Sequence, residues 1–461
     1  RWAASASAHL AAVPPYAPVE AKRAAWDDDA RAVSAEASSR AARTRAVQLL
    51  RAALSHVPDW PAAHALLADL FHAQHQALER ARRPADAEAV AADLREHDRA
   101  GRFRRYLTGT GAVTLHTDVP VEVVLHRLVE RDRRWVPERE RSLGPTPLDR
   151  VPLEMGSWLL TLHRDDHEVV TYPVWLGRGE HWHGVRPGDT APHPVWIPPR
   201  GALVPGEVYV PAGWFWSGEE EFEHTLPLRR IWVDGFAIDR FPATVGTYVG
   251  YLNAMVDAGD GPGALAAMPR LGDADEPLFA RDAAGRFVGI RQDRHGAGWD
   301  LVPTDPETPV TNLDWHQAVG FARWAGRRLP VELEWQKAAR GADLRRYPWG
   351  DRFEPSYCRM VLSAPQSMIV PVSDHPTDVS PYGVRGMAGN VSDWVLDGIP
   401  ALPDQETSDI ALVRVSDAPQ RLVTGGSCGA GPRTCEVTQR SRISATSRGM
   451  KIGFRTARAI G

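Results

Sequence analysis

The chain has 461 residues, which at ~150 residues per domain is enough for two or three domains and excludes a single small module. Its 54 Lys and Arg residues nearly balance 58 Asp and Glu residues. The resulting net charge of -4 disfavours binding driven by phosphate charge, so we expect no nucleic-acid partner. No apolar run approaches the ~18 residues that a membrane span needs, so we expect no membrane insertion within this chain.

Cysteine content and the start of the chain bear on its compartment. Three cysteines, Cys358, Cys428 and Cys435, cannot build a disulfide framework. No signal sequence opens the chain, so the default expectation is a cytoplasmic location. Because the first residue is Arg1 rather than Met, excision from a longer polypeptide stays open, and its front would carry a targeting segment or another enzyme.

Residues 1–105 form the first predicted segment, and it is helical. Apolar side chains recur at helical spacing over residues 46–54 and again over residues 66–71. Pro58 and Pro61 separate these runs, because proline ends one helix and suits the first turn of the next. A further helix is predicted over residues 84–98. The pattern resembles a tetratricopeptide unit, although only about one and a half repeats are visible, and a plain helical hairpin linker is an equal alternative.

Residues 106–202 form the second segment, in which the apolar period changes to two, as in β-strands. We predict strands over residues 112–117, 121–125 and 159–163, with further β-structure between them. A Pro turn at 118–120, Gly-x-Thr-Pro-Leu at 144–148 and Gly-Ser-Trp at 156–158 stand in the order of the small β-sandwich called PEGA, which this segment resembles. That resemblance implies a binding or spacing role. The proline-rich residues 192–205 are predicted to be a stiff, extended connector.

Residues 203–461 form the third segment, where aromatic, Gly and Pro motifs follow one another, with a short amphipathic helix predicted over residues 318–324. The motifs include Trp-Val-Asp-Gly-Phe at 232–236, Arg-Arg-Leu-Pro at 327–330, Glu-Trp-Gln-Lys-Ala-Ala-Arg-Gly at 334–341, Tyr-Pro-Trp-Gly-Asp at 347–351, Gly-Asn-Val-Ser-Asp-Trp at 389–394, Gly-Gly-Ser at 425–427 and Gly-Phe-Arg at 453–455. This series resembles the formylglycine-generating enzyme family, also called the sulfatase-modifying-factor domain, whose fold is an elaborated C-type lectin.

The predicted fold class is therefore α+β. It comprises a C-type-lectin-like domain with the formylglycine-generating-enzyme fold at the C-terminus, a small β-sandwich in the middle and an α-helical N-terminal segment. The order of the three segments also resembles the tails of large bacterial Ser/Thr protein kinases. That resemblance implies a bacterial signalling context in which a protein kinase domain precedes the chain.

The resemblance implies a test for catalysis, because active members are copper-dependent oxidases that convert a substrate Cys into formylglycine. Two thiolates hold Cu(I), three and eight residues after the Ser of Gly-Gly-Ser, and soft sulfur ligands suit that ion. Counting from Ser427, these positions are Ala430 and Cys435, so one ligand is missing. Cys428 is a substitute only if the site tolerates a shift of about 7 Å along a strand. Copper is therefore not expected, and Ser427, Cys428 and Cys435 are the catalytic residues only if the domain is active.

The family's calcium site is implied at the Gly-Asn pair. Gly389 and Val391 would supply main-chain oxygens and Asp393 a carboxylate, whereas Gly386 stands where a further side-chain oxygen is expected. The site is thus one ligand short, and calcium is an open expectation. At a second calcium position Arg359 replaces an oxygen ligand, and its charge would repel the ion.

These departures lead us to expect a non-catalytic recognition module. Its ligand, a peptide, a protein or a small molecule, would contact the C-terminal stretch at Cys428, Gly429, Ala430, Arg433, Thr434, Gln439 and Arg442. The alternatives are a copper-dependent oxidase acting on cysteine or another thiol, a retroelement-diversified variable binding protein, and a spacer or oligomerisation element.

Overall fold

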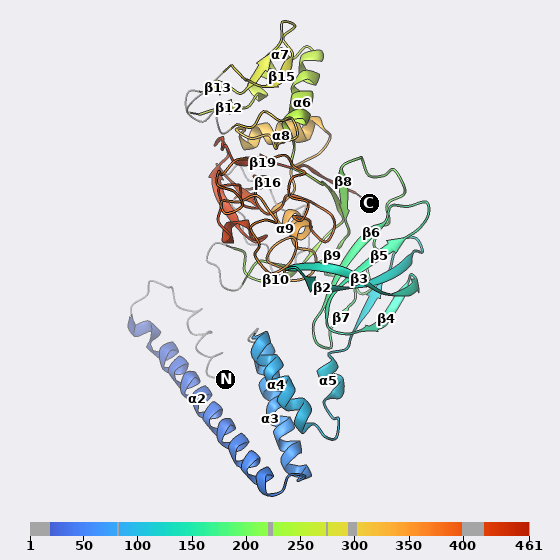
Figure 1. Cartoon of the computed structure of the whole chain (residues 1–461), viewed down its shortest axis with the longest axis vertical. Coiled ribbons are helices and arrows are strands. Elements are labelled where there is room, and N and C mark those ends of the chain that lie inside the picture. Colours follow the sequence, from blue (N-terminus) through green and yellow to red (C-terminus); the bar gives the residue numbers. More distant parts are fainter. Residues whose placement is uncertain are drawn as a thin grey trace. The chain divides into compact units, whose positions relative to one another are not determined.

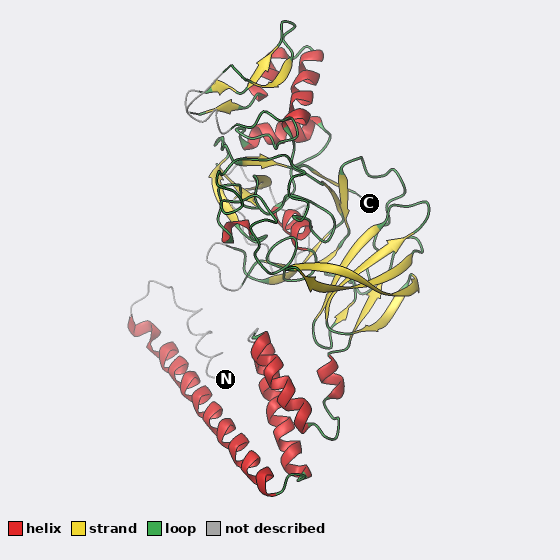
Figure 2. Cartoon of the chain, viewed as in Figure 1, coloured by secondary structure: helices red, strands yellow, loops and turns green. Residues whose placement is uncertain are grey.

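The computed structural model describes residues 19–80, 83–219, 225–272, 275–293, 302–398 and 419–460 (Figure 1). The chain divides into two compact units, Arg1–Thr110 and Gly111–Gly461. Figure 2 shows that the described part of the first unit is helical and that the second combines strands with a few helices, which confirms the α+β fold class. None of the helices in the described ranges is long and apolar enough to cross a membrane.

The first unit contains four helices in its described part: α2 (Val19–His56), α3 (Pro61–Arg80), α4 (Pro84–His97) and α5 (Arg104–Thr108). The break between α2 and α3 falls where Pro58 and Pro61 predict it. Helices α3 and α4 pack side by side (Figure 1). Their shared core contains Leu67, Phe71 and Leu94, against which α2 places partly buried aliphatic side chains.

The second unit begins with two sheets that share one core. A four-stranded sheet has the order β3-β2-β5-β6, and a three-stranded sheet has the order β4-β1-β7. Buried side chains that alternate along these strands, among them Val123, Leu125, Trp158 and Leu160, fill the space between the sheets. The two sheets form a small β-sandwich, and its strands fall in the segment where the period-two pattern predicts β-structure. Its strands are β1 (Gly111–Leu115), β2 (Glu122–Arg131), β3 (Arg134–Pro145), β4 (Leu148–Leu153), β5 (Gly156–His163), β6 (Val170–Leu176) and β7 (His181–Trp182).

The proline-rich residues 192–205 lie against this sandwich. Val195 and Ile197 are buried in its core. The Val195 amide donates to His116 O at 2.8 Å, and the Ile197 amide donates to the Asp118 carboxylate at 2.9 Å. The stretch is therefore held to the sandwich by backbone hydrogen bonds as well as by burial.

The rest of the described second unit has little regular structure. Its strands form five small sheets with the orders β10-β9, β20-β11-β8, β12-β13, β14-β15 and β18-β17-β16-β19. Helix α9 (Glu332–Arg340) is buried at every position. Helix α8 starts three residues before the predicted run because Asp314 caps its N-terminus, accepting from the Gln317 amide at 2.9 Å. The remaining elements are β8 (Glu207–Val210), β9 (Gly213–Ser217), β10 (Arg229–Val233), β11 (Phe236–Asp239), α6 (Val245–Asp257), α7 (Gly261–Ala267), β12 (Arg270–Leu271), β13 (Glu276–Pro277), β14 (Phe279–Arg281), β15 (Phe287–Ile290), α8 (Trp315–Trp324), β16 (Ser392–Gly398), β17 (Gln420–Thr424), β18 (Arg440–Ser444), β19 (Ile452–Phe454) and β20 (Ala457–Ala459).

The hairpin between β2 and β3 contacts the loop formed by residues 347–357. The Trp135 amide donates to Trp349 O at 2.8 Å, and its indole N–H donates to the Asp351 carboxylate at 3.2 Å. At the hairpin tip, Arg133 donates to Phe353 O at 2.9 Å. The sandwich therefore supports a loop that also packs against the candidate site described next.

Candidate functional site

The Gly-Gly-Ser motif follows β17 directly and turns the chain sharply. Gly425 and Gly426 have φ values of 93° and 67°, which glycine adopts without the strain that other residues incur. A Cβ atom on Gly426 would lie 2.7 Å from Cys435 Sγ. Backbone conformation and close packing thus require glycine at both positions. The turn leads into residues 427–435.

Cys428 is fully buried in a small apolar cluster with Ile369 and Val391. Its amide donates to Asn390 O at 2.9 Å, and its thiol donates to Ser367 O at 3.4 Å. Burial raises the pKa of the Cys428 thiol, against the smaller opposing effect of nearby cations. Cys428 is therefore held as a neutral thiol.

Cys435 lies in a different cluster and ends the short 3₁₀ turn η3 (Arg433–Cys435). It is fully buried, and its cluster includes Tyr347, Trp349 and Cys358. A hydrogen bond between the two thiols raises the pKa of Cys358, and burial raises it further. The described structure thus brings Cys435 into thiol contact with Cys358 and places Cys428 in a separate cluster.

The remaining predicted ligand-binding residues lie in two places. Some are on the loop formed by residues 428–434, here called the tip loop, and the others are at strand β18. Gly429, Arg433 and Thr434 are exposed on the loop, and Ala430 is half-buried. Gln439 and Arg442 instead lie at and within β18, where Arg442 pairs with Leu422 of β17. Only the first group adjoins the buried cysteines along the chain.

Two exposed aliphatic residues beside the tip loop were not predicted. The Val361 amide donates to Ala430 O at 3.1 Å, which joins the loop at residues 361–363 to the tip. The side chains of Val361 and Leu362 are 42% and 60% exposed. No sequence pattern indicates them, because they lie in an irregular loop where apolar residues do not recur at helical or strand spacing. Together with residues 429–434 they form a surface, here called the tip surface, that contains both apolar and polar groups.

A family model described as "Sulfatase-modifying factor enzyme 1-like domain" matches residues 196–460. That match covers more than half of the chain. The chain belongs to this family.

The formylglycine-generating enzyme of Mycobacterium tuberculosis is 28% identical over 290 residues, covering 54% of this chain and 96% of that enzyme. The serine/threonine-protein kinase pkn1 of Chlamydia caviae is 28% identical over 192 residues, covering 41% of this chain and 27% of the kinase. Among solved structures, PvdO from Pseudomonas aeruginosa aligns over 55% of this chain and 94% of its own with a TM-score of 0.41 and 22% identity.

The thiols of this sulfatase-modifying factor domain do not match the copper pair that the sequence resemblance implies. Ala430 stands at one thiolate position and has no metal ligand in its side chain. The thiol that contacts Cys435 comes from Cys358, which precedes the Gly-Gly-Ser motif. Both of these thiols are fully buried in one cluster with Tyr347 and Trp349.

Asp393, the side-chain ligand of the implied calcium position, is partly engaged by other side chains. One oxygen of the Asp393 carboxylate accepts from Arg455 at 2.6 Å and from Trp335 at 2.8 Å. The other oxygen, Oδ1, is buried and has no hydrogen-bond partner among the described residues. That oxygen is free to serve as one ligand of a hard cation. Arg455 already balances the negative charge of the carboxylate, so the protein does not need an ion for neutralisation.

Proposed function

We propose that the sulfatase-modifying factor domain of this chain is a recognition module rather than an oxidase. The observation that supports this most directly is the burial of the Cys435 thiol. That thiol is inaccessible to solvent and contacts Cys358. A thiol oxidase must bring its ligand sulfur, its metal and a substrate thiol together. A fully covered sulfur without an adjacent second thiolate at position 430 does not meet that requirement.

The tip surface is the proposed ligand-binding surface. It presents exposed Val361 and Leu362 next to Arg433 and Thr434, and this mixture of aliphatic, cationic and hydroxyl groups suits a peptide or a protein surface. A small molecule is the alternative ligand. Because the matched region of pkn1 belongs to a protein titled a serine/threonine-protein kinase, we propose a bacterial signalling context, with a kinase domain as a partner in a longer chain.

The experiment is an anaerobic titration of the full chain with Cu(I) against a competing chelator, followed by a Cys-x-Pro-x-Arg peptide and oxygen. The recognition module predicts no tight copper binding and no loss of peptide thiol. Cys435→Ser and Cys428→Ser are run as matched variants. Tight one-to-one copper binding that Cys435→Ser abolishes, with consumption of the peptide thiol, would overturn the proposal.

The second candidate function is oxidation of a cysteine or a related thiol with Cys358 in place of the missing ligand. The specific observation in its favour is the contact between the Cys358 and Cys435 thiols. In that case Cys358→Ser and Cys435→Ser would both abolish copper binding, whereas Cys428→Ser would leave it unchanged. The same titration therefore separates the two functions.

Calcium binding at Asp393 is a separate proposal, supported by the unpartnered Oδ1 oxygen. An ion held there would raise the thermal midpoint of unfolding in proportion to the logarithm of calcium concentration. A scan with calcium and with a chelator measures this shift. Magnesium is the control, because it demands near-octahedral geometry and loses its waters reluctantly, whereas calcium accepts irregularly placed protein oxygens. Equal midpoints in calcium and chelator would contradict it.

A further inference from the structure

A cavity of about 350 Å³ lies within the second unit, between the β-sandwich and the sulfatase-modifying factor domain. The sandwich contributes the start of β6 and the proline-rich stretch, and the domain contributes β8 together with Arg240 and Tyr382. Its size falls at the lower end of the range for small-molecule sites. The lining residues that matter here are aliphatic or charged: Glu168, Val169, Val204, Val208 and Arg240.

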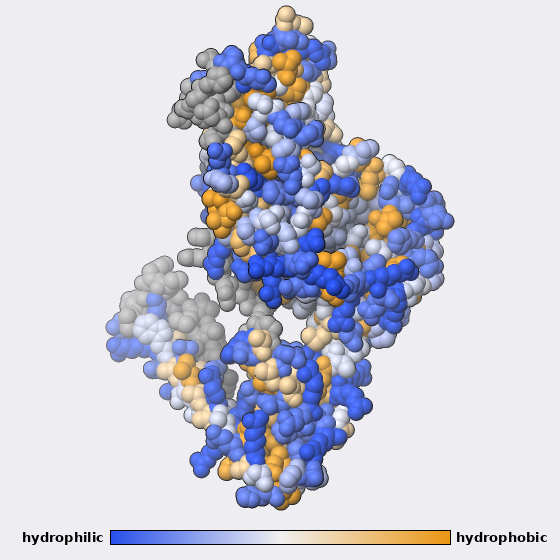
Figure 3. Space-filling view, viewed as in Figure 1, coloured by the Kyte–Doolittle hydropathy of each residue, from blue (hydrophilic) through white to orange (hydrophobic). Residues whose placement is uncertain are grey.

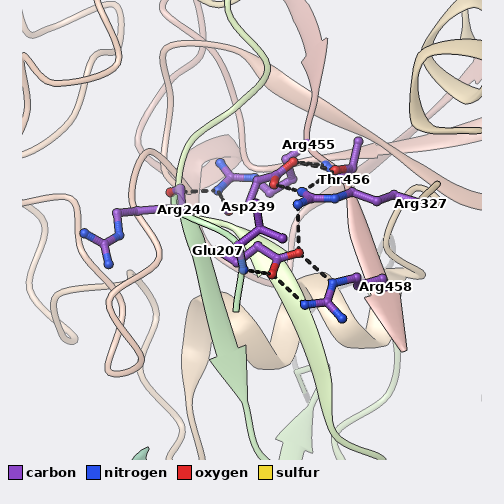
Figure 4. A network of polar contacts seen from close by, with 8 residues as sticks. Glu207, Asp239, Arg240, Arg327, Arg455, Thr456 and Arg458 are labelled. Carbon is purple, nitrogen blue, oxygen red and sulfur yellow. Dashed lines mark hydrogen bonds and ion pairs between the residues drawn. The ribbon is translucent and has the colours of Figure 1, made fainter. Parts of the chain in front are cut away.

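The charges behind the cavity balance one another without Arg240. Glu207 accepts from Arg458 at 2.8 Å and lies 2.8 Å from Arg327. Burial alone would raise the pKa of Glu207, but its hydrogen bonds to Arg458 and the backbone, with the nearby arginine charges, hold that pKa below its usual value. Arg327 also pairs with Asp239, and Arg455, another guanidinium group drawn in Figure 4, pairs with Asp393. Arg240 is the surplus cation of this cluster.

Arg240 has a fixed backbone and a free side chain. Its amide donates to Gly206 O at 2.8 Å, and its carbonyl accepts from the Arg385 amide at 2.8 Å. Figure 4 shows its guanidinium directed away from the rest of the cluster. Within the described ranges no hydrogen bond or ion pair of that guanidinium is found, and the residue is exposed. The fold thus presents five N–H donors in a planar fork at the cavity without a protein acceptor.

Glu168 supplies the opposite charge on the sandwich side of the cavity. One of its carboxylate oxygens accepts from the Gly201 amide at 3.1 Å, and it forms no ion pair with a described cation. Val169 and Val204, also in the lining, are 57% and 51% exposed. On the face drawn in Figure 3, polar residues predominate and apolar residues form scattered patches. The exposed side chains of Val169 and Val204 therefore give the cavity an apolar surface that a ligand can cover.

We propose that this cavity binds a small zwitterion with an aliphatic side chain, an α-amino acid or a short peptide. Its carboxylate would pair with Arg240, in the bidentate geometry that a guanidinium favours. Its ammonium group would pair with Glu168, and its side chain would cover Val169 and Val204. The inference does not depend on the recognition function proposed for the tip surface, because none of these residues lies at residues 427–435.

The test is isothermal titration of the full chain with L-leucine and with L-leucyl-L-leucine, which distinguish an amino acid from a peptide as the ligand. Two analogues each lack one charge: 4-methylpentanoate has no ammonium group, and 3-methylbutylamine has no carboxylate. We expect one-to-one saturable binding of at least one zwitterion. Arg240→Gln and Glu168→Gln should each weaken it by about tenfold or more, since both remove a charged hydrogen-bond partner.

Arg281→Gln is the matched control, because Arg281 lies on β14 and donates to the backbone of Gly285. It should bind like the unchanged chain. The Arg240 guanidinium makes no described contact that folding requires, and an unchanged thermal midpoint verifies that each variant is folded. Absence of saturable binding of either zwitterion up to about 10 mM would overturn the proposal. So would binding that both variants leave unchanged, or equal affinity for leucine and 4-methylpentanoate.

Discussion

The thiols of Cys358 and Cys435 contact each other in a cluster that also contains Tyr347 and Trp349, although the two cysteines lie in loops far apart in the chain. Tyr347 and Trp349 stack with ring centroids 5.0 Å apart, and the hydroxyl of Tyr347 donates to Pro432 O at 3.3 Å. These contacts join the loop at residues 347–357 to the loop that ends at Cys435. The cysteine pair is therefore part of the packing that connects two long loops.

Thiol reactivity is the first consequence of this burial. All three cysteines are fully buried, and the pKa values of Cys358 and Cys428 are raised, so little thiolate is present at neutral pH. We expect none of the three to react promptly with Ellman's reagent in the folded chain and all three to react after denaturation. A count of released thionitrobenzoate before and after adding guanidinium measures this. One fast-reacting thiol in the folded chain would show that the cluster is open.

The sandwich hairpin provides a second test, because Trp135 packs against Gly350 and bonds to Trp349 and Asp351. Trp135→Ala should lower the free energy of unfolding by about 2 kcal/mol through lost packing and the lost indole hydrogen bond to Asp351, while the backbone bond to Trp349 stays. It should also speed the reaction of Cys358 and Cys435 with Ellman's reagent. Trp324→Ala is the control, since that side chain is 51% exposed on α8. If both variants leave thiol reactivity equally slow, the hairpin does not support the loop.

The sequence was informative where local chemistry decides the structure. Prolines at 58 and 61 marked the break between α2 and α3, and the ordered motifs indicated the family. The turn between β2 and β3 was not predicted, because Asp132 and Arg133 adopt φ values of 48° and 63° without being glycine or asparagine. Contacts to the distant residues Phe353 and Tyr357 hold this turn. The strain is offset by interactions that no local pattern reveals.

The contact partners of individual site residues could not be predicted from the sequence either. Cys358 is separated from Cys435 by most of the C-terminal loops, and only the folded chain shows that their sulfurs meet. Arg240 lies four residues after the Trp-Val-Asp-Gly-Phe motif, but its lack of an acceptor among the described residues depends on Glu207 and Asp239 being paired with other arginines. Such charge balance is a property of tertiary structure. Composition and spacing do not determine it.

Asp397 provides a pH-dependent test of the domain core. It is buried, accepts from the Glu332 amide and lies near other carboxylates, and burial raises its pKa to about 7. Because the folded chain binds this proton more tightly than the unfolded chain, stability is lost as pH rises from about 4 to about 7. Asp397→Asn keeps an acceptor for the amide and removes the ionisation.

The variant should therefore match the unchanged chain near pH 4 and exceed it at pH 7.5, by an amount on the order of 4 kcal/mol at most. Urea unfolding at both pH values, followed by tryptophan fluorescence, gives the two differences. Asp374→Asn, at an exposed position, is the control and should show no such trend. A constant difference between Asp397→Asn and the unchanged chain would contradict the raised pKa.

The helical unit should respond to acid in the opposite direction, through the buried His97, whose ring contacts a second histidine, His64. His64 Nε2 donates to Pro58 O at 2.9 Å, so its Nδ1 is an acceptor, and His97 Nδ1 lies 3.0 Å from it and donates. Burial lowers the pKa of His97, with the neighbouring His64 and Arg51 acting in the same direction against Glu96. The unfolded chain then binds the proton more tightly. The stability present above about pH 6.5 is consequently lost as pH falls below it.

Thermal melts followed by helical circular dichroism at pH 7.5 and pH 5 measure this loss. His97→Gln keeps a donor toward His64 and cannot ionise, so its melting temperature should fall less between the two pH values than that of the unchanged chain. His56→Gln alters an exposed histidine at the end of α2 and should behave like the unchanged chain. If His97→Gln loses as much stability in acid as the unchanged chain, protonation of His97 is not the cause.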